Sequence, residues 1–251
     1  RMKKVPLALQ FWSVREDQKK DFAGTVAAVR EIGYEAAELY GYDNLEASKE
    51  IEDLLSADLK AVSMHVSIDR LRHDTEAVAA EAEALSCTNV VCPYLPPETF
   101  TSVDSCEAAG RELNDFGFAF RELGLEFFYH NHWWELEEIE SRVGFERLFE
   151  NASPENLGME LDVCFVKKMG LDPAGYIRKH RDRIGLIHLK DGVSGEGETE
   201  FGEGEVDFPE VRETASESSV LRGFIMEHEH YHEDQFSVVR DGYHRLKALG
   251  F

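Results

Sequence analysis

Short apolar runs alternate with amphipathic segments along the whole chain. Each apolar run is bounded by turn residues, which is typical of buried parallel strands. Between the runs, apolar residues recur at helical spacing, and Gly33 and Gly124 follow two such segments, where a left-handed cap ends a helix. The pattern predicts strands at 7–12, 36–40, 61–66, 90–94, 125–129, 158–162, 184–188 and 224–227, with helices at 22–32, 51–55 and 108–123.

Eight strands alternating with helices within 251 residues predict a single (β/α)8 barrel, the TIM barrel. A doubly wound open sheet is the alternative, but its glycine-rich phosphate fingerprint should follow the first strand. Residues 10–15, QFWSVR, contain no such motif. The chain shows no linker and no repeat beyond the strand–helix unit, so we expect residues 1–251 to form one domain.

The composition is that of a folded globular protein with an acidic surface. Apolar residues make up 43% of the chain, and 27 basic against 50 acidic residues give a net charge of −23. Such a surface repels phosphates, so we expect no nucleic-acid partner. No apolar run is long enough to span a bilayer or to act as a signal peptide, and the four scattered cysteines are expected to be reduced. These features predict a cytoplasmic protein without a membrane partner.

Polar side chains stand at the carboxyl ends of the predicted strands, which meet at one end of a barrel. Four successive strands end at His130, Asp162, His188 and Glu227. Their separations of 32, 26 and 39 residues are each about one strand–helix unit. One such residue alone is more often an ordinary turn residue, but four in register predict a metal site with nitrogen and oxygen ligands. The other polar residues at these ends are His65, His132, Lys190 and Glu229.

Five segments of the chain carry a family resemblance. They are YHNH (129–132), ELDVCFVKKMGLDP (160–173), RIGLIHLKD (183–191), FGEGEVDF (201–208) and IMEHE (225–229). Together they resemble the xylose isomerase-like TIM-barrel superfamily, in particular the bacterial sugar phosphate isomerase/epimerase group. The resemblance covers nearly the whole chain and implies a divalent metal ion held at the barrel mouth. Asp162, His188 and Glu227 match the group's Asp, His and Glu ligands.

The end of the fifth strand departs from the family pattern. Better-studied epimerases of the superfamily carry a glutamate there, which serves as both ligand and acid/base, whereas this chain has His130. We predict His130 as a nitrogen ligand, with His132 as the alternative, because period-two alternation places both on one side. Glu135 lies close in sequence and is a candidate oxygen donor or substrate contact.

The predicted site and the resemblance together indicate a metal-dependent isomerase or epimerase of a small sugar or polyol-derived ketone. One divalent ion (Mn, Co, Zn or Mg) would polarise the carbonyl of this carbohydrate, and a base would remove the neighbouring proton to give an enediolate. Glu227 is the leading candidate for the base, with Glu160 and Glu135 as partners. Candidate substrate contacts are His65, Lys190, Glu38, Trp12, His132 and Phe165.

Other outcomes stay open at the level of sequence. Loss of a β-hydroxyl from the same enediolate would make the protein a sugar or inosose dehydratase, and a barrel that retains the ligands can also bind sugar or metal without turnover. Hydrolysis like that of the superfamily's apurinic endonuclease would need a basic groove, which the net charge of −23 argues against. Members of the group are often dimers, so a homodimer is one candidate assembly.

Overall fold

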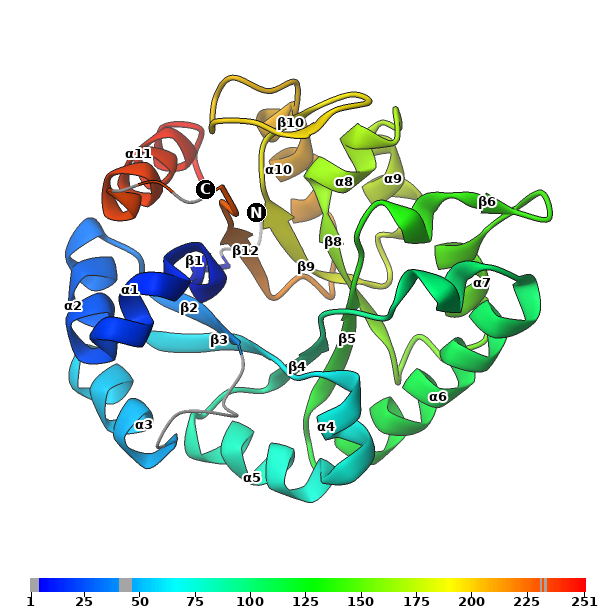
Figure 1. The fold of residues 1–251 in the computed structure, drawn as a ribbon, viewed down its shortest axis with the longest axis horizontal. Helices are drawn as coiled ribbons and strands as arrows, with labels where there is room; N and C mark the ends of the chain where they lie inside the picture. Colours follow the sequence, from blue (N-terminus) through cyan, green and yellow to red (C-terminus); the bar gives the residue numbers. More distant parts are fainter. Residues whose placement is uncertain (1–4, 41–46, 231, 233) are drawn as a thin grey trace.

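The computed structural model describes residues 5–40, 47–230, 232 and 234–251. A closed barrel of eight parallel strands forms its centre, in the order β1-β12-β9-β8-β5-β4-β3-β2, and helices surround the strands (Figure 1). This architecture confirms the predicted single (β/α)8 TIM barrel. The barrel strands are β1 (Leu7–Gln10), β2 (Ala36–Tyr40), β3 (Lys60–His65), β4 (Asn89–Cys92), β5 (Glu126–His130), β8 (Gly158–Asp162), β9 (Ile184–Leu189) and β12 (Gly223–Met226).

All eight predicted strands are present, each within two residues of its predicted bounds. The prediction was wrong for Phe11 and Trp12, which lie in a 3-10 turn, η1 (Phe11–Val14). The strand stops at Gln10 because its own side chain accepts the Trp12 backbone N–H at 2.9 Å and caps the turn. This turn carries Trp12 over the barrel mouth instead of along the wall.

The helices follow from local signals in the sequence. Helix α2 has the predicted bounds, because Asp21 caps its start by accepting the Gly24 N–H at 2.9 Å and Gly33 ends it with a φ of 125°. Helices α3 and α6 are longer than predicted. The helices are α1 (Arg15–Lys20), α2 (Phe22–Ile32), α3 (Ala47–Ser56), α4 (Ile68–His73), α5 (Thr75–Ala84), α6 (Val103–Glu122), α7 (Gly144–Glu150), α8 (Val163–Lys168), α9 (Pro173–His180), α10 (Phe208–Ser216) and α11 (Gln235–Ala248), with 3-10 turns η2 (Pro97–Phe100) and η3 (Trp134–Leu136).

A layer of apolar side chains, the apolar floor, fills the inside of the barrel below the polar strand ends. Its one large ring is Phe128, and an added Cβ at Gly158 or Gly185 would lie only 2.6 or 2.3 Å from that ring. The two glycines therefore make room for the ring, as packing at crystal-like density requires. The floor consists of Ala8, Ala36, Val91, Phe128, Leu186 and Ile225, each at most 3% exposed.

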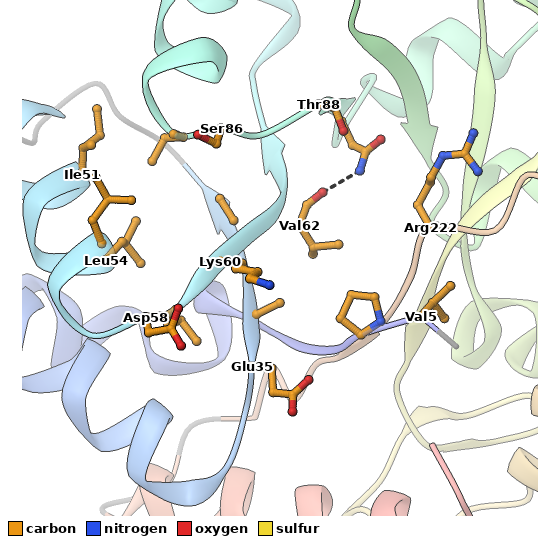
Figure 2. Close-up of a pocket in the computed structure, with 17 residues that line it drawn as sticks. Val5, Glu35, Ile51, Leu54, Asp58, Lys60, Val62, Ser86, Thr88 and Arg222 are labelled. Atoms are coloured by element: carbon orange, nitrogen blue, oxygen red, sulfur yellow. Dashed lines mark hydrogen bonds between the residues drawn. The ribbon is translucent and has the colours of Figure 1, made fainter. Parts of the chain in front are cut away.

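A cavity of about 640 Å³ opens beneath the floor, at the N-terminal end of the barrel. Figure 2 shows it between helix α3, which contributes Ile51 and Leu54, and the first residues of strands β2 and β3. Its walls are mainly apolar, and at one side Asn89 donates a hydrogen bond to the Val62 carbonyl at 2.6 Å. The apolar floor separates this cavity from the polar strand ends.

Two hairpins outside the barrel were not predicted, since two-residue strands carry no periodic signal. They are β6 (Glu138–Ile139) with β7 (Arg142–Val143), and β10 (Gly192–Val193) with β11 (Gly197–Glu198). All four cysteines are buried and free, as expected. Among the described residues, no helix combines the length and the apolar character that a membrane span requires.

Candidate active site

The predicted polar residues gather inside the barrel, one layer above the apolar floor. Several lie two positions after a floor residue on the same strand, as His130 follows Phe128 and His188 follows Leu186. Because strand side chains alternate, a spacing of two keeps them pointing inward. The residues that meet here are Glu38, His65, His130, Glu160, Asp162, His188 and Glu227, and all but His65 are at most 4% exposed.

The first group, here called the imidazole cluster, consists of Glu38, His65, His130, Glu160 and His188. Glu160 Oε1 is its centre, with His65 Nε2 at 2.7 Å, His188 Nε2 at 3.0 Å and His130 Nδ1 at 3.1 Å. Glu38 Oε1 lies 2.9 Å from His65 Nε2 and 2.6 Å from His188 Nε2. Two carboxylates therefore share two imidazoles across the barrel.

Two further side chains hold Glu38 in place. The Gln10 amide donates to Glu38 Oε1 at 2.7 Å, and the Ser63 hydroxyl donates to Oε2 at 2.5 Å. Both oxygens of Glu38 are thus used within the protein. The structure places Glu38, predicted as a substrate contact, beneath the imidazoles with no exposed surface.

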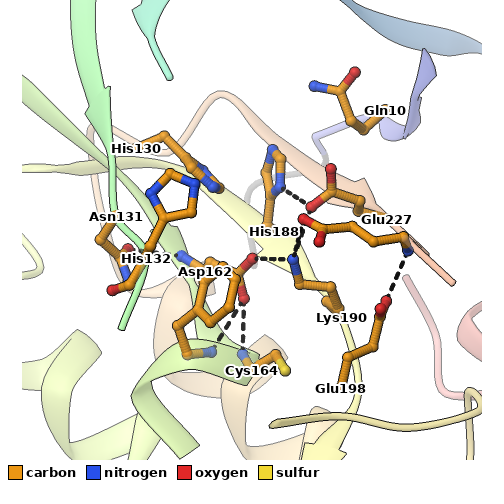
Figure 3. Close-up of polar contacts among 12 residues, drawn as sticks. Gln10, His130, Asn131, His132, Asp162, Cys164, His188, Lys190, Glu198 and Glu227 are labelled. Carbon is orange, nitrogen blue, oxygen red and sulfur yellow. Dashed lines mark hydrogen bonds and ion pairs between the residues drawn. The ribbon is translucent and has the colours of Figure 1, made fainter. Parts of the chain in front are cut away.

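The second group, here called the lysine cluster, consists of Asp162, Lys190, Glu227 and Glu229. Figure 3 shows Lys190 between Asp162 and Glu227. The Lys190 ammonium lies 3.0 Å from Asp162 Oδ2, 3.1 Å from Glu227 Oε2 and 2.9 Å from Glu229 Oε1. His188 joins the two groups, because its Nδ1 lies 3.1 Å from Glu227 Oε2. Lys190 is buried and pairs with carboxylates, and its Nζ lies 4.2 Å from the Phe165 ring centre.

Burial and neighbouring charges shift the protonation equilibria of these residues in different directions. Burial opposes the charging of His188, but Glu160, Glu38 and Glu227 outweigh it and raise the His188 pKa well above its usual range. In the same way, Glu38 and Glu160 raise the pKa of His65 to about 10 against its burial. For His130, burial together with positive neighbours, His188 first, lowers the pKa well below the usual range.

The carboxylates differ as well. Burial raises the pKa of Glu160, an effect that nearby Glu38 reinforces and His188 only partly offsets. Burial would also raise the pKa of Glu227, but Lys190 and His188 overcome it and lower that pKa well below the usual range. Glu227 is therefore ionised at neutral pH, held by two cationic partners.

The donor set suits a divalent cation. Within these two clusters, atoms that lie within 4.8 Å of one another form the candidate ligand groups His65–His130–Glu160–His188 and Asp162–His188–Glu227. Among the described residues, the buried Glu160 Oε2 and His130 Nδ1 make no hydrogen bond. The carboxylates that hold protons on His65 and His188 would equally attract a metal ion, which would displace those protons.

The four predicted ligands do not fall into one group. Asp162, His188 and Glu227 lie together, whereas His130 lies with Glu160 and His65 on the other side of His188. Glu160, predicted as a partner of the base, thus belongs to a candidate ligand group. The second oxygen of Asp162 is used locally, since Oδ1 accepts the Cys164 N–H at 2.9 Å and caps helix α8.

A second cavity, of about 390 Å³, opens at the mouth of the barrel above both clusters. That volume lies within the range of small-molecule sites. Trp12, 40% exposed, and Tyr94 contribute aromatic surface to it. The cavity is lined by Trp12, Tyr40, His65, Val66, Ser67, Arg70, Pro93, Tyr94, His130, His132, Glu227 and Glu229.

His132 and Glu135 lie beside the clusters. Strand β5 ends at His130, so alternation does not continue to His132, whose ring instead stacks on Trp134 at 4.3 Å while still lining the cavity. Glu135 is fully buried, where it accepts the Tyr129 hydroxyl at 2.8 Å and the His132 backbone N–H at 2.9 Å. Its carboxylate thus supports the loop after β5, whereas Glu160 belongs to one of the two candidate ligand groups.

Sequence reasoning missed Gln10, Ser63 and Asn131. Asn131 Oδ1 accepts the Asp162 backbone N–H at 2.9 Å and so joins the ends of β5 and β8 (Figure 3). A signal was present, since a polar residue near the end of an otherwise apolar strand needs a buried partner. Gln10 and Ser63 both meet that description.

The sequence profile of the xylose isomerase-like TIM barrel matches residues 26–249. The chain belongs to this family. Members and relatives of known structure share its barrel. A sugar phosphate isomerase/epimerase from Parabacteroides distasonis ATCC 8503 superposes with a TM-score of 0.85 at 22% identity, covering 96% of this chain and 98% of that one.

Two further structures similar to this xylose isomerase-like barrel carry different activities in their names. The probable 3-DHS dehydratase AsbF from Bacillus anthracis has a TM-score of 0.75 at 16% identity, with 97% and 99% coverage of the two chains. L-ribulose 3-epimerase has a TM-score of 0.75 at 11% identity, with 98% and 94% coverage. At these identities the likeness shows the fold. No curated protein matches the chain in sequence.

Proposed function

We propose that the protein is a divalent-metal-dependent isomerase or epimerase of a small sugar or polyol-derived ketone. The observation that carries the proposal is a buried group of imidazoles and carboxylates that reaches a cavity at the barrel mouth through His65, His130 and Glu227. In TIM barrels this end is where catalytic residues gather. The isomerase/epimerase and epimerase names among its structural relatives support the same class of reaction.

Asp162, His188 and Glu227 would hold the metal ion, and His130 and Glu160 stand next to them on the far side of His188. When bound there, a divalent ion supplies Lewis-acid polarisation of a carbonyl and so acidifies the neighbouring C–H. Nitrogen and oxygen ligands together suit Mn, Co, Zn or Mg to differing degrees.

Glu227 is the proposed base. Lys190 and His188 both contact its Oε2, which fixes the carboxylate. One oxygen would be a ligand of the metal ion, and the other would take the substrate proton. The carboxylate also lines the cavity, whereas Glu160 has no exposed surface. Glu160, whose pKa is raised by burial, is the second candidate to take or return a proton.

The cavity walls would orient the ligand. Trp12 and Tyr94 offer flat apolar surface to the C–H groups of a sugar ring, and His132 lies beside them. Lys190 acts from behind the cavity wall: it is 1% exposed and sets the charge of Asp162 and Glu227. We therefore assign it a positioning role in place of the predicted substrate contact.

A dehydratase is the alternative, since one structural relative is named as a probable dehydratase and both reactions begin with removal of the same proton. The two reactions differ in their second step. Return of the proton gives an isomer or epimer, whereas loss of a β-hydroxyl gives an unsaturated product and water. The net charge of −23 continues to disfavour phosphodiester hydrolysis.

The proposal is tested by metal analysis followed by a substrate screen in deuterated water. Protein purified without chelator is assayed for bound Mn, Co, Zn and Mg, and then incubated with ketoses, inososes and keto-sugars. NMR of each mixture should show deuterium entering next to the carbonyl of at least one compound, and this exchange should stop after chelation and resume on adding metal. A metal-bound protein that tightly binds a sugar without exchanging its proton would instead be a binding barrel.

A further inference from the structure

A second group of histidine and glutamate side chains lies outside the barrel mouth clusters. Glu200 follows strand β11, and His228 and His232 follow strand β12. His232 Nε2 lies 2.8 Å from Glu200 Oε1, and His228 Nε2 lies 3.9 Å from Glu200 Oε2. These ligand atoms all lie within 4.8 Å of one another. Ligands bound at about 2.1 Å around one tetrahedral ion are about 3.4 Å apart, so only small side-chain shifts are needed to bind a metal.

His228 is oriented as a metal ligand would be. Its Nδ1 faces Glu198 Oε1 at 3.5 Å, while its Nε2 faces Glu200 and makes no hydrogen bond among the described residues. The ring is only 1% exposed, and a buried nitrogen without a partner is costly. A carboxylate behind one imidazole nitrogen with a metal on the other is the recurrent arrangement of metal-bound histidines.

The backbone around the group is held in place. Glu198, visible beside the lysine cluster in Figure 3, accepts the backbone N–H groups of Glu229 at 2.8 Å and His230 at 3.3 Å. The Gln235 side chain accepts the His232 N–H at 3.1 Å and donates to the His228 carbonyl at 3.4 Å. The rings of His228 and His232 stack with their centres 5.6 Å apart.

We infer that Glu200, His228 and His232 form a second divalent metal site, selective for a transition metal such as Zn²⁺. Two imidazoles and one carboxylate favour Zn²⁺ over Mg²⁺, which prefers oxygen ligands alone. Glu200 and His232 keep 46% and 43% of their side chains exposed, so a fourth ligand would be water. The inference does not rest on the proposed enzymatic function.

A metal ion here would join two loops that carry residues of the barrel mouth. Glu227 precedes His228 in the chain, but its side chain turns inward to His188 and Lys190. Glu229 contacts Lys190 at 2.9 Å and lines the mouth cavity. Zinc bound to Glu200 would therefore fix the segment that positions Glu227 and Glu229, without touching the substrate.

The test counts bound zinc and does not depend on turnover. Chelator-treated protein is titrated with Zn²⁺ against a chromophoric competitor, and retained zinc is measured after gel filtration. Glu200→Gln and His232→Ala should each retain one Zn²⁺ fewer per chain than the wild type. Both positions are partly exposed, so both variants should fold. Glu198→Gln should weaken binding about 10- to 100-fold, the usual effect of removing a carboxylate behind a histidine ligand.

His230→Ala is the matched control, because His230 lies in the same segment and is 62% exposed but does not belong to the ligand group. It should retain as much zinc as the wild type. The inference is overturned if Glu200→Gln and His232→Ala retain the wild-type amount, or if His230→Ala loses as much zinc as they do. If the variants show the expected differences in bound zinc but the wild-type protein turns over no sugar, the result counts against the proposed function and leaves the zinc site standing.

Discussion

Glu227→Gln separates the chemical role of the carboxylate from its structural role. Glutamine keeps the shape of the side chain but removes the negative charge and the proton acceptor. Loss of a positioned general base costs about 10²- to 10⁴-fold in rate, or about 3 to 5 kcal/mol in the barrier. We expect kcat to fall by this amount, and by more if the metal ion is also lost.

The structural cost of the same change should be small. The attraction between Glu227 and Lys190 at 3.1 Å is about 5 kcal/mol at an effective dielectric constant of about 20. Most of the lost attraction is offset, because burying the neutral amide of glutamine costs less free energy than burying the carboxylate. Lys190 also keeps Asp162 at 3.0 Å and Glu229 at 2.9 Å. The free energy of unfolding should therefore fall by only about 1 to 2 kcal/mol.

The assay combines three measurements on the variant: metal content, urea unfolding, and exchange of the substrate α-proton with deuterated solvent. Glu229→Gln is the matched control, because it removes another partner of Lys190 from a side chain that is 41% exposed. It should slow exchange by less than about tenfold, since a rim carboxylate contributes far less than a base. If Glu227→Gln exchanges the proton at the wild-type rate with metal bound, Glu227 is not the base and Glu160 takes its place.

Three further predictions concern binding, packing and pH. In steady-state kinetics, Trp12→Ala should raise KM roughly tenfold with little change in kcat. The reason is that losing about 50 Å² of apolar contact with the substrate costs about 1.3 kcal/mol in the ground state and the transition state alike. A fall in kcat with unchanged KM would contradict this. Gly117→Ala should lower the free energy of unfolding, measured in urea, by about 1 to 3 kcal/mol, because its Cβ would lie 1.8 Å from the Asn156 carbonyl oxygen. The neighbouring variant Phe118→Ala, at a half-exposed site, should change the free energy of unfolding far less. Burial, with a smaller contribution from Asp53, raises the pKa of Glu50 from about 4.5 to about 7. The folded state therefore binds the extra proton between these values, and stability falls as the pH rises through this range. Glu50→Gln should remove that loss and raise the melting temperature at pH 8 but not at pH 4, and an equal shift at both pH values would refute the assignment.

The sequence was sufficient to predict the barrel because the apolar residues follow two distinct periods in alternating segments, one typical of strands and one typical of helices. Apolar strands and amphipathic helices differ in period, and cap residues such as Asp21 and Gly33 mark where one gives way to the other. Glu160 and Asp162, two positions apart on β8, both point inward, as strand alternation requires. These are local properties, which a pattern along the chain can report.

The contacts between side chains on opposite sides of the barrel could not be predicted from a pattern along the chain. Glu38 on β2 touches His188 on β9, 150 residues away, because strand tilt and stagger bring their ends together. The same geometry places His130 beside Glu160 instead of beside Asp162. The direction of the His132 ring has a local cause, since the strand ends before it and the ring turns onto Trp134 while it still lines the cavity.

The apolar floor has a consequence for how the protein exchanges material with water. Phe128 is the large ring of this layer, and Ala36, a member of the same layer, also borders the N-terminal cavity. The floor thus lies between a mainly apolar cavity and the charged side chains of the mouth. Among the described residues, the charged side chains adjoin the cavity at the mouth that Trp12 and Tyr94 line, so this is the side from which water and ligands reach them. A small side chain in place of Phe128 would leave a void in the layer between the two cavities.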